Sequence, residues 1–120
     1  MNNPVGAPLE IAVRKDTGAH VVEIAGDFVI SSREAVGRAI EDLLDSGGYS
    51  VVVDGTRLSH IDTPSLALLT RLSARCREAG GDLVLTGLPA RFAALVKALR
   101  LDEALTFEET VGRALERLGA

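Results

Sequence analysis

The side chains with the most chemical potential lie together between positions 54 and 65, in the segment DGTRLSHIDTPS. Two carboxylates, Asp54 and Asp62, flank this segment, and His60 lies between them. Four hydroxyl groups accompany them, those of Thr56, Ser59, Thr63 and Ser65. In an enzyme, His60 could act as a general base and Ser59 or Thr63 as a nucleophile.

A structural role explains the same segment better. Thr63 is expected to be the N-cap of a helix, and Asp62 favours the positive end of that helix. A catalytic triad needs a mutual geometry that a local cluster does not establish, and the two histidines, His20 and His60, do not make a metal site. We therefore predict a protein-binding surface with no catalytic residue, no metal and no cofactor. Its expected members are Asp54, Ser59, His60, Asp62, Thr63, Pro64 and Ser65.

The strands that position this segment follow from the spacing of apolar residues. Leu9, Ile11 and Val13 alternate with polar or small residues, and a β-branched run at 20–24 follows a turn, so the two segments predict an antiparallel hairpin that Gly26 ends. The apolar run at 49–53 predicts a central strand that ends at Asp54, and residues 55–61 are expected to form a loop. A further apolar strand is expected at 83–85, and a short extended piece near 104–107.

Apolar stripes with helical spacing follow the hairpin and each of the later strands. Helices are predicted to begin near Ser31 or Ser32, at Thr63 with Pro64 in the first position, and at Pro89. A last helix carries Val111 to Leu118, and Thr106 and Glu109 have the spacing of its capping box. The second helix has a charged side with Arg71, Arg75 and Arg77, which is expected to be solvated, with partner docking as the alternative.

This order predicts one α/β domain at residues 9–120, with a flexible N-terminal arm at residues 1–8. Its sheet is expected to be mixed, an N-terminal hairpin followed by alternating strands and helices, with about four helices packed against it. A chain of 120 residues with 47% hydrophobic residues suits a single soluble domain. The net charge of −4 and the 3% of aromatic residues oppose binding to nucleic acid or to anionic membranes.

The remaining sequence features indicate a cytoplasmic protein. Cys76 is the one cysteine, so it forms no intramolecular disulfide, and it is expected to be a small core residue. Residues 1–8 lack the basic and apolar regions of a secretory leader, and no segment approaches the length of a membrane span.

The order of elements, together with the segments Val51-Val52-Val53-Asp54 and Ile61-Asp62-Thr63-Pro64-Ser65-Leu66, resembles the STAS family, the sulfate transporter and anti-sigma factor antagonist domain. The resemblance runs from about Leu9 to Leu118 and includes Gly26-Asp27-Phe28 and Leu99-Arg100-Leu101. It implies a module that binds an anti-sigma factor, a serine/threonine kinase of the ATP-binding type, and thereby releases a sigma factor. It also implies that phosphorylation by the partner kinase disables this binding.

The family switch lies in an Asp-Ser-Ser-Gly-like motif, and the chain departs from it. Asp62 matches the motif's Asp and Thr63 its first hydroxyl residue, whereas Pro64 occupies the phosphoacceptor position and Ser65 the Gly position. Since proline has no hydroxyl, Thr63 and Ser65 are the phosphorylation candidates, and a constitutive binder is equally compatible with the sequence. Two different functions stay open as well. One is a subunit of another STAS assembly, such as a stressosome or a lipid-transport complex; the other is a small-ligand sensor or hydrolase with a closed pocket near Asp54 and His60.

Overall fold

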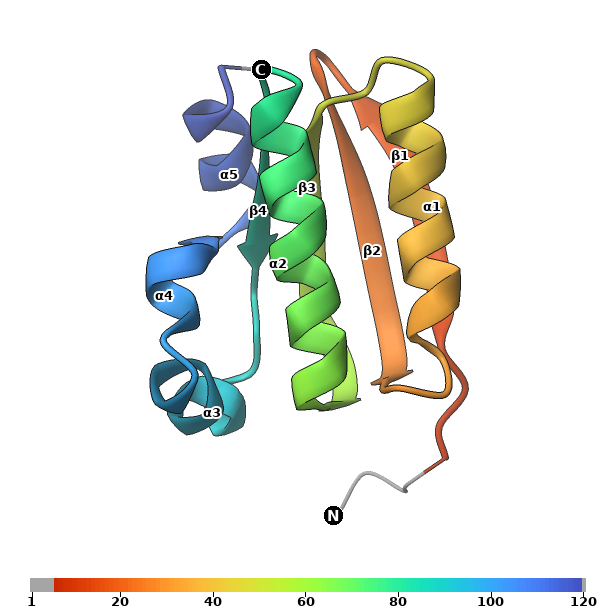
Figure 1. Cartoon of the computed structure of the whole chain (residues 1–120), viewed down its shortest axis with the longest axis vertical. Coiled ribbons are helices and arrows are strands. Elements are labelled where there is room, and N and C mark those ends of the chain that lie inside the picture. Colours follow the sequence, from red (N-terminus) through yellow and green to blue (C-terminus); the bar gives the residue numbers. More distant parts are fainter. Residues whose placement is uncertain (1–5, 120) are drawn as a thin grey trace.

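The computed structural model describes residues 6–119, which form a five-stranded sheet in the order β1-β2-β3-β4-β5 (Figure 1). Strands β1 (Glu10–Asp16) and β2 (Ala19–Phe28) pair antiparallel. Strands β3 (Ser50–Ile61), β4 (Asp82–Thr86) and β5 (Thr106–Glu108) continue the sheet in parallel pairs. The predicted mixed α/β sheet with an N-terminal hairpin is confirmed.

The helices are α1 (Arg33–Asp45), α2 (Thr63–Glu78), α3 (Ala93–Ala98), α4 (Leu101–Ala104) and α5 (Val111–Arg117), with a 3₁₀ turn, η1 (Ala90–Phe92), before α3. The helix expected from Pro89 onward is thus divided into η1, α3 and α4. Arg100 precedes α4 in the left-handed region, with φ of 54°, which ends α3 and turns the chain. The division gives residues 6–119 five α-helices where about four were expected.

Side chains from both faces of the sheet make the core. On one face, β2, β3 and β4 pack against α1 and α2, which lie side by side in Figure 1. On the other face, Val21, Val52 and Val84 pack against Ala114 of α5. Cys76 is fully buried in the first of these clusters, as predicted. The core therefore fixes α2 firmly against the sheet.

Two strands extend further than the sequence indicates. Residues 55–61 are not a loop, because β3 continues through them and pairs with β2 as far as Phe28 and Ile61. Gly26 does not end β2 either. It lies at a shift of the β2–β3 register and has φ of +88°, and a Cβ there would lie 2.0 Å from the carbonyl oxygen of Pro8. Because Gly26 has no side chain, the chain before β1 can lie close against β2 without ending the strand.

The N-terminal arm is described from residue 6 onward, and its residues 1–5 lie outside the described part. The backbone N–H of Gly6 donates to Asp27 Oδ2 at 2.7 Å, and that of Asp27 donates to the carbonyl of Ala7 at 3.2 Å. These bonds hold residues 6 and 7 against the end of β2.

The capping box expected at Thr106 and Glu109 is wrong. Thr106 belongs to β5, and its hydroxyl donates to Asp82 Oδ2 at 3.0 Å. Thr110 is the N-cap of α5, where its hydroxyl oxygen accepts from the N–H of Arg113 at 3.1 Å. A strand pairing with β4 thus takes Thr106 out of the helix start.

Candidate functional site

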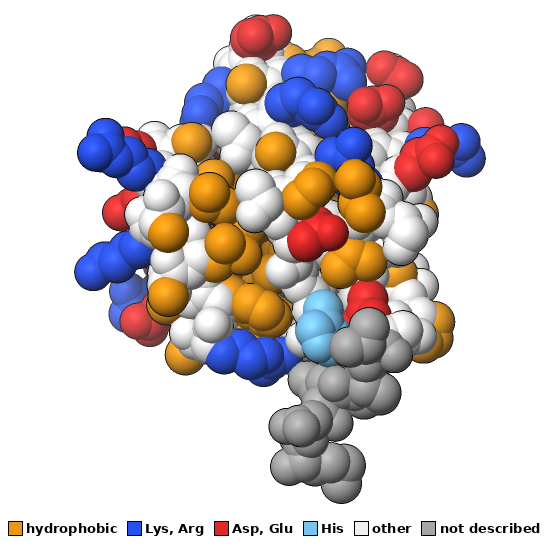
Figure 2. Space-filling model, turned by 60° about the horizontal axis from the view of Figure 1, so that its bottom comes forward, with side chains coloured by type: hydrophobic (Ala, Val, Ile, Leu, Met, Phe, Trp, Pro, Cys, Tyr) orange, Lys and Arg blue, Asp and Glu red, His pale blue; other side chains and the backbone are white. Residues whose placement is uncertain are grey.

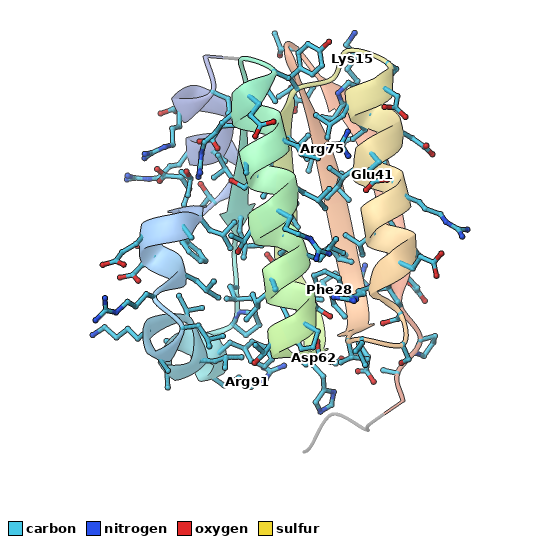
Figure 3. The ribbon with its side chains drawn as sticks, in the orientation of Figure 1. Lys15, Phe28, Glu41, Asp62, Arg75 and Arg91 are labelled. Atoms are coloured by element: carbon cyan, nitrogen blue, oxygen red, sulfur yellow. The ribbon has the colours of Figure 1, made fainter. Side chains whose placement is uncertain are left out.

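The candidate site lies at the end of the molecule where β2 and β3 finish and α2 begins, the lower end in Figures 1 and 3. The carboxylate of Asp62 connects the segment that follows β2 to the first turn of α2. Its Oδ1 accepts from the N–H of Ser65 at 3.0 Å, and its Oδ2 accepts from the N–H of Ile30 at 2.8 Å. Asp62 is therefore the N-cap of α2, and the expectation that Thr63 fills this position is wrong. The extended backbone of Asp62, with ψ of 171°, aims its carboxylate back over the first turn.

The surroundings of Asp62 stabilise its ionised form. Partial burial of Asp62 raises the pKa of the carboxyl group, but Ser65, the N–H of Ile30 and the guanidinium of Arg33 together lower that pKa below its usual value. The Ser65 hydroxyl lies near the carboxylate without meeting hydrogen-bond geometry, so we ascribe the contribution of Ser65 chiefly to its N–H. Asp62 is charged at neutral pH and fixes the β2–α1 segment to α2.

A second carboxylate, Asp27, lies beside His60 at this end. Nδ1 of His60 is 2.9 Å from Asp27 Oδ1, and the other carboxylate oxygen accepts from Gly6. Asp27 is only 6% exposed. The hydrogen bond with His60 is the main cause that lowers the pKa of Asp27, against the opposing effect of burial. His60 thus positions the chain before β1 through Asp27.

Two arginines connect the site to the neighbouring helices. Arg33 at the start of α1 donates to the carbonyl of Pro64 at 3.0 Å. Arg91 of η1 donates to the carbonyls of Leu58 and Ser59 at 3.0 and 2.9 Å, with its guanidinium 4.7 Å from the centre of the Phe92 ring. Figure 3 labels both Arg91 and Asp62 at the lower end of the molecule. These bonds fix the ends of β3 and α2 on rigid elements.

The side chains at the start of α2 differ strongly in exposure. Ile30 is 61% exposed and Thr63 is exposed, whereas Pro64 is half-buried. Ser65 is fully buried, and its hydroxyl has no hydrogen-bond partner. Figure 2 shows hydrophobic side chains gathered over this end of the molecule, beside acidic side chains and a histidine. We call the group formed by Ile30, Asp62, Thr63 and Pro64 the end surface.

The structure brings most of the predicted site residues together but leaves Asp54 apart. Ser59, His60 and Asp62 to Ser65 lie at or next to the end of β3. Asp54 lies in the middle of β3, six residues of extended strand, or about 20 Å, from His60. Its carboxylate accepts from the N–H and hydroxyl of Thr56. Asp54 therefore shapes its own segment of β3 and does not share a site with His60.

Four residues of the site were missed in the sequence: Asp27, Ile30, Arg33 and Arg91. Asp62 contacts Ile30 across 32 positions, and His60 contacts Asp27 across 33. Local signals could have drawn attention to two of them: Asp27 is an aspartate beside Gly26, and Ile30 lies just before the two serines where a helix was expected to begin.

Two further features concern metals and membranes. Within residues 6–119, no three or more His, Cys, Asp or Glu side chains gather in a way that could hold a metal ion. In the same part of the chain, none of the helices has the length and apolar character needed to cross a membrane.

Comparison with known structures gives the same fold. A candidate anti-sigma factor antagonist from Thermotoga maritima is 14% identical, with 92% of this chain and 95% of that chain covered and a TM-score of 0.84. An anti-sigma factor antagonist from Mycobacterium paratuberculosis is 18% identical over 100% of both chains, with a TM-score of 0.76. An RsbS variant of Moorella thermoacetica is 22% identical over 91% of this chain and 94% of that one, with a TM-score of 0.72. Identities this low establish a shared fold only.

No curated protein matches the sequence closely enough to be informative. The family model described as "Mlab, STAS domain" matches residues 11–109, which include both sides of the candidate site. The chain therefore belongs to the STAS domain family.

Proposed function

We propose that this chain is a non-enzymatic regulator that binds an anti-sigma factor, a serine/threonine kinase of the ATP-binding type, through the end surface. The observation that carries the proposal is Ile30, which is 61% exposed although its backbone is fixed by Asp62. Ile30 is the most exposed of the large apolar side chains in residues 6–119, and it adjoins a groove that Leu68 lines, so the apolar surface here is more than one isolated side chain. The proposed domain is residues 9–120, acting in the cytoplasm, with residues 1–8 preceding it.

The polar groups around Ile30 hold the backbone at this end of the molecule. The candidate base His60 is engaged with Asp27, and the carbonyl of Ser59 accepts from Arg91. Asp62 has both carboxylate oxygens occupied by backbone N–H groups. The polar groups therefore hold the surface in shape, and such preorganisation lowers the cost of binding a partner.

Binding of the cognate anti-sigma factor by titration calorimetry tests the role of the end surface. Ile30→Arg replaces the apolar contact by a charge and is expected to weaken the affinity at least tenfold, since a buried aliphatic side chain contributes about 1.5–3 kcal/mol. Tyr49→Arg is the matched control, because Tyr49 is 41% exposed and precedes β3 at the opposite end of the sheet. Equal affinities for the two variants would remove Ile30 from the interface.

We propose that Thr63 is the residue at which the partner kinase would phosphorylate this chain. Position 64 has no hydroxyl, and Ser65 is fully buried, so Thr63 alone of the two candidates presents its side chain to a kinase. Thr63→Asp is expected to weaken partner binding by placing a charge within the contact. Phosphosite mass spectrometry of the free and partner-bound fractions should find modified Thr63 enriched in the free fraction, and modification of Ser65 instead would contradict this assignment.

A second candidate function is that of a subunit in another STAS assembly, stressosome-like or lipid-transporting. The match to a family model described as "Mlab, STAS domain" favours keeping it. Affinity capture from the source cell separates the two candidates. Recovery of an ATPase or scaffold subunit supports the second, and recovery of an anti-sigma factor supports the first.

A further inference from the structure

A groove lies between α1 and α2, beside the end surface, and the proposed function gives it no role. Its volume is about 460 Å³, and it opens next to Ile30. Gly37 of α1 and Leu68 of α2 form its floor, and Arg33, Arg38 and Arg71 are among the residues of its walls.

The floor of the groove is apolar because Leu68 of α2 lies there opposite Gly37, in the second turn of α1. Gly37 is buried, and a Cβ built there would lie 3.5 Å from Cδ2 of Leu68. A larger residue at position 37 would therefore occupy the space above Leu68. Glycine leaves open the space that a methyl group would fill next to Leu68 on the floor of the groove.

The acidic groups of the groove are already paired. Glu34 accepts from Arg38 at 2.6 Å, and a carboxylate oxygen of Glu41 lies 3.6 Å from a guanidinium nitrogen of Arg75. Figure 3 labels Glu41 on α1 and Arg75 on α2. Arg33 donates to Pro64. Arg71 is exposed and forms no ion pair within 4.0 Å in residues 6–119. On a chain with a net charge of −4, this groove thus offers an uncompensated cation beside an apolar floor.

We propose that the groove binds an acidic, aliphatic segment of a partner protein, with the aliphatic side chain against Gly37 and Leu68 and a carboxylate paired with Arg71. This inference rests on the proposed protein-binding function, and it names the chemistry of the segment that continues from the end surface past Ile30. Charge complementarity favours such a segment, because Arg71 is free to pair with a carboxylate, whereas the acidic groups of the groove already have partners and offer a basic segment little.

Selection from a library of random peptides displayed on phage tests this proposal without knowledge of the partner. The wild-type protein is expected to select peptides in which aspartate or glutamate lies close to leucine, isoleucine or valine. The Arg71→Glu variant should lose these peptides. The matched control is Arg113→Glu, the same charge reversal at an exposed position on α5.

A selected peptide, made synthetically with a fluorescent label, then gives the affinity by anisotropy and the position by NMR. Arg71→Glu is expected to weaken it by about tenfold or more and Arg113→Glu to leave it unchanged. The amide of Gly37 should show one of the larger shifts. Selection of peptides without acidic residues, equal affinity for Arg71→Glu and wild type, or shifts confined to other elements would each overturn the proposal.

The outcome is separable from that of the proposed function. If Arg71→Glu binds the anti-sigma factor normally and Ile30→Arg does not, the proposed role of the groove is refuted and the proposed role of the end surface stands. Loss of the peptide in Arg71→Glu, with normal binding of the anti-sigma factor by Ile30→Arg, would refute the end surface instead.

Discussion

Replacing Asp62 by alanine removes the two hydrogen bonds that hold the candidate site together. Loss of the N-cap bond to Ser65 costs about 1 kcal/mol of stability. The bond from Ile30 to the other oxygen is at an exposed position, where water can replace it in part, so its loss costs about 1 kcal/mol more. For a chain of 120 residues, an unfolding entropy of about 2.1 cal/mol/K per residue converts the total into a fall in Tm of about 8 °C.

The asparagine variant divides this loss between the two bonds. Asn is a good N-cap, and its one carbonyl oxygen can still accept from Ser65. Its amide nitrogen cannot accept from Ile30, so Asp62→Asn should lose about half as much Tm, about 4 °C. Asp42→Asn is the matched control, because Asp42 is exposed on α1 and should cost less than about 0.5 kcal/mol.

Thermal unfolding followed by circular dichroism measures these differences and their pH dependence. The pKa of Asp62 is lowered from 3.8 in the folded chain, so its stabilising effect is complete at neutral pH and is lost as the pH falls through the folded value. The gap in Tm between wild type and Asp62→Asn should therefore close only below about pH 4. The reasoning is refuted if Asp62→Ala unfolds at the same temperature as Asp42→Asn at pH 7.

Three further predictions concern Ser65, Gly26 and Cys76, each measured against wild type. Ser65→Ala removes a buried hydroxyl without a partner and should raise stability by about 0.5–1 kcal/mol in urea unfolding; a loss would show that the hydroxyl is bonded. Gly26→Ala should lower the stability of the protein by about 1–3 kcal/mol, because the added Cβ would meet the carbonyl oxygen of Pro8. The NMR signal of the Gly6 amide should shift as well, and an unshifted signal would contradict the close approach of Pro8 to Gly26. Burial raises the pKa of Cys76 to about 11, so a disulfide reagent at pH 8 should label it only on unfolding, and rapid labelling of the folded protein would oppose this.

Local spacing predicts the elements that the core requires. Val36 and Ile40 of α1, and Val51 and Val53 of β3, are all fully buried where apolar periodicity places them. The extension of β3 to Ile61 could not be predicted in this way, because its residues include Gly55, Thr56 and Ser59, and their pairing with β2 decides the conformation. The length of β3 is therefore set by its pairing with β2 and not by local propensity.

The candidate site, too, could be predicted only in the part that is contiguous in the sequence. The cluster from His60 to Ser65 is contiguous, so its chemistry is visible in the sequence. Its partners Asp27 and Ile30 come from β2 and the segment after it, and only the parallel pairing of β2 with β3 brings them within hydrogen-bond distance. The N-cap of α2 fell on Asp62, one residue before the expected Thr63, because Asp62 can bind Ser65 and Ile30 at once.

This arrangement also determines what a phosphate on Thr63 would meet. The first turn of α2 has few free donors: Ser65 N–H binds the Asp62 carboxylate, Leu66 N–H binds the Asp62 carbonyl, and Pro64 has none. A phosphate there would lie beside the negative charge of Asp62 without the cradle of N–H groups that helix starts usually offer to anions. Phosphorylation of Thr63 would therefore act by repelling a partner from the end surface, not by ordering a new conformation. A Thr63→Asp variant should then lose partner affinity while its unbound NMR spectrum changes only near α2.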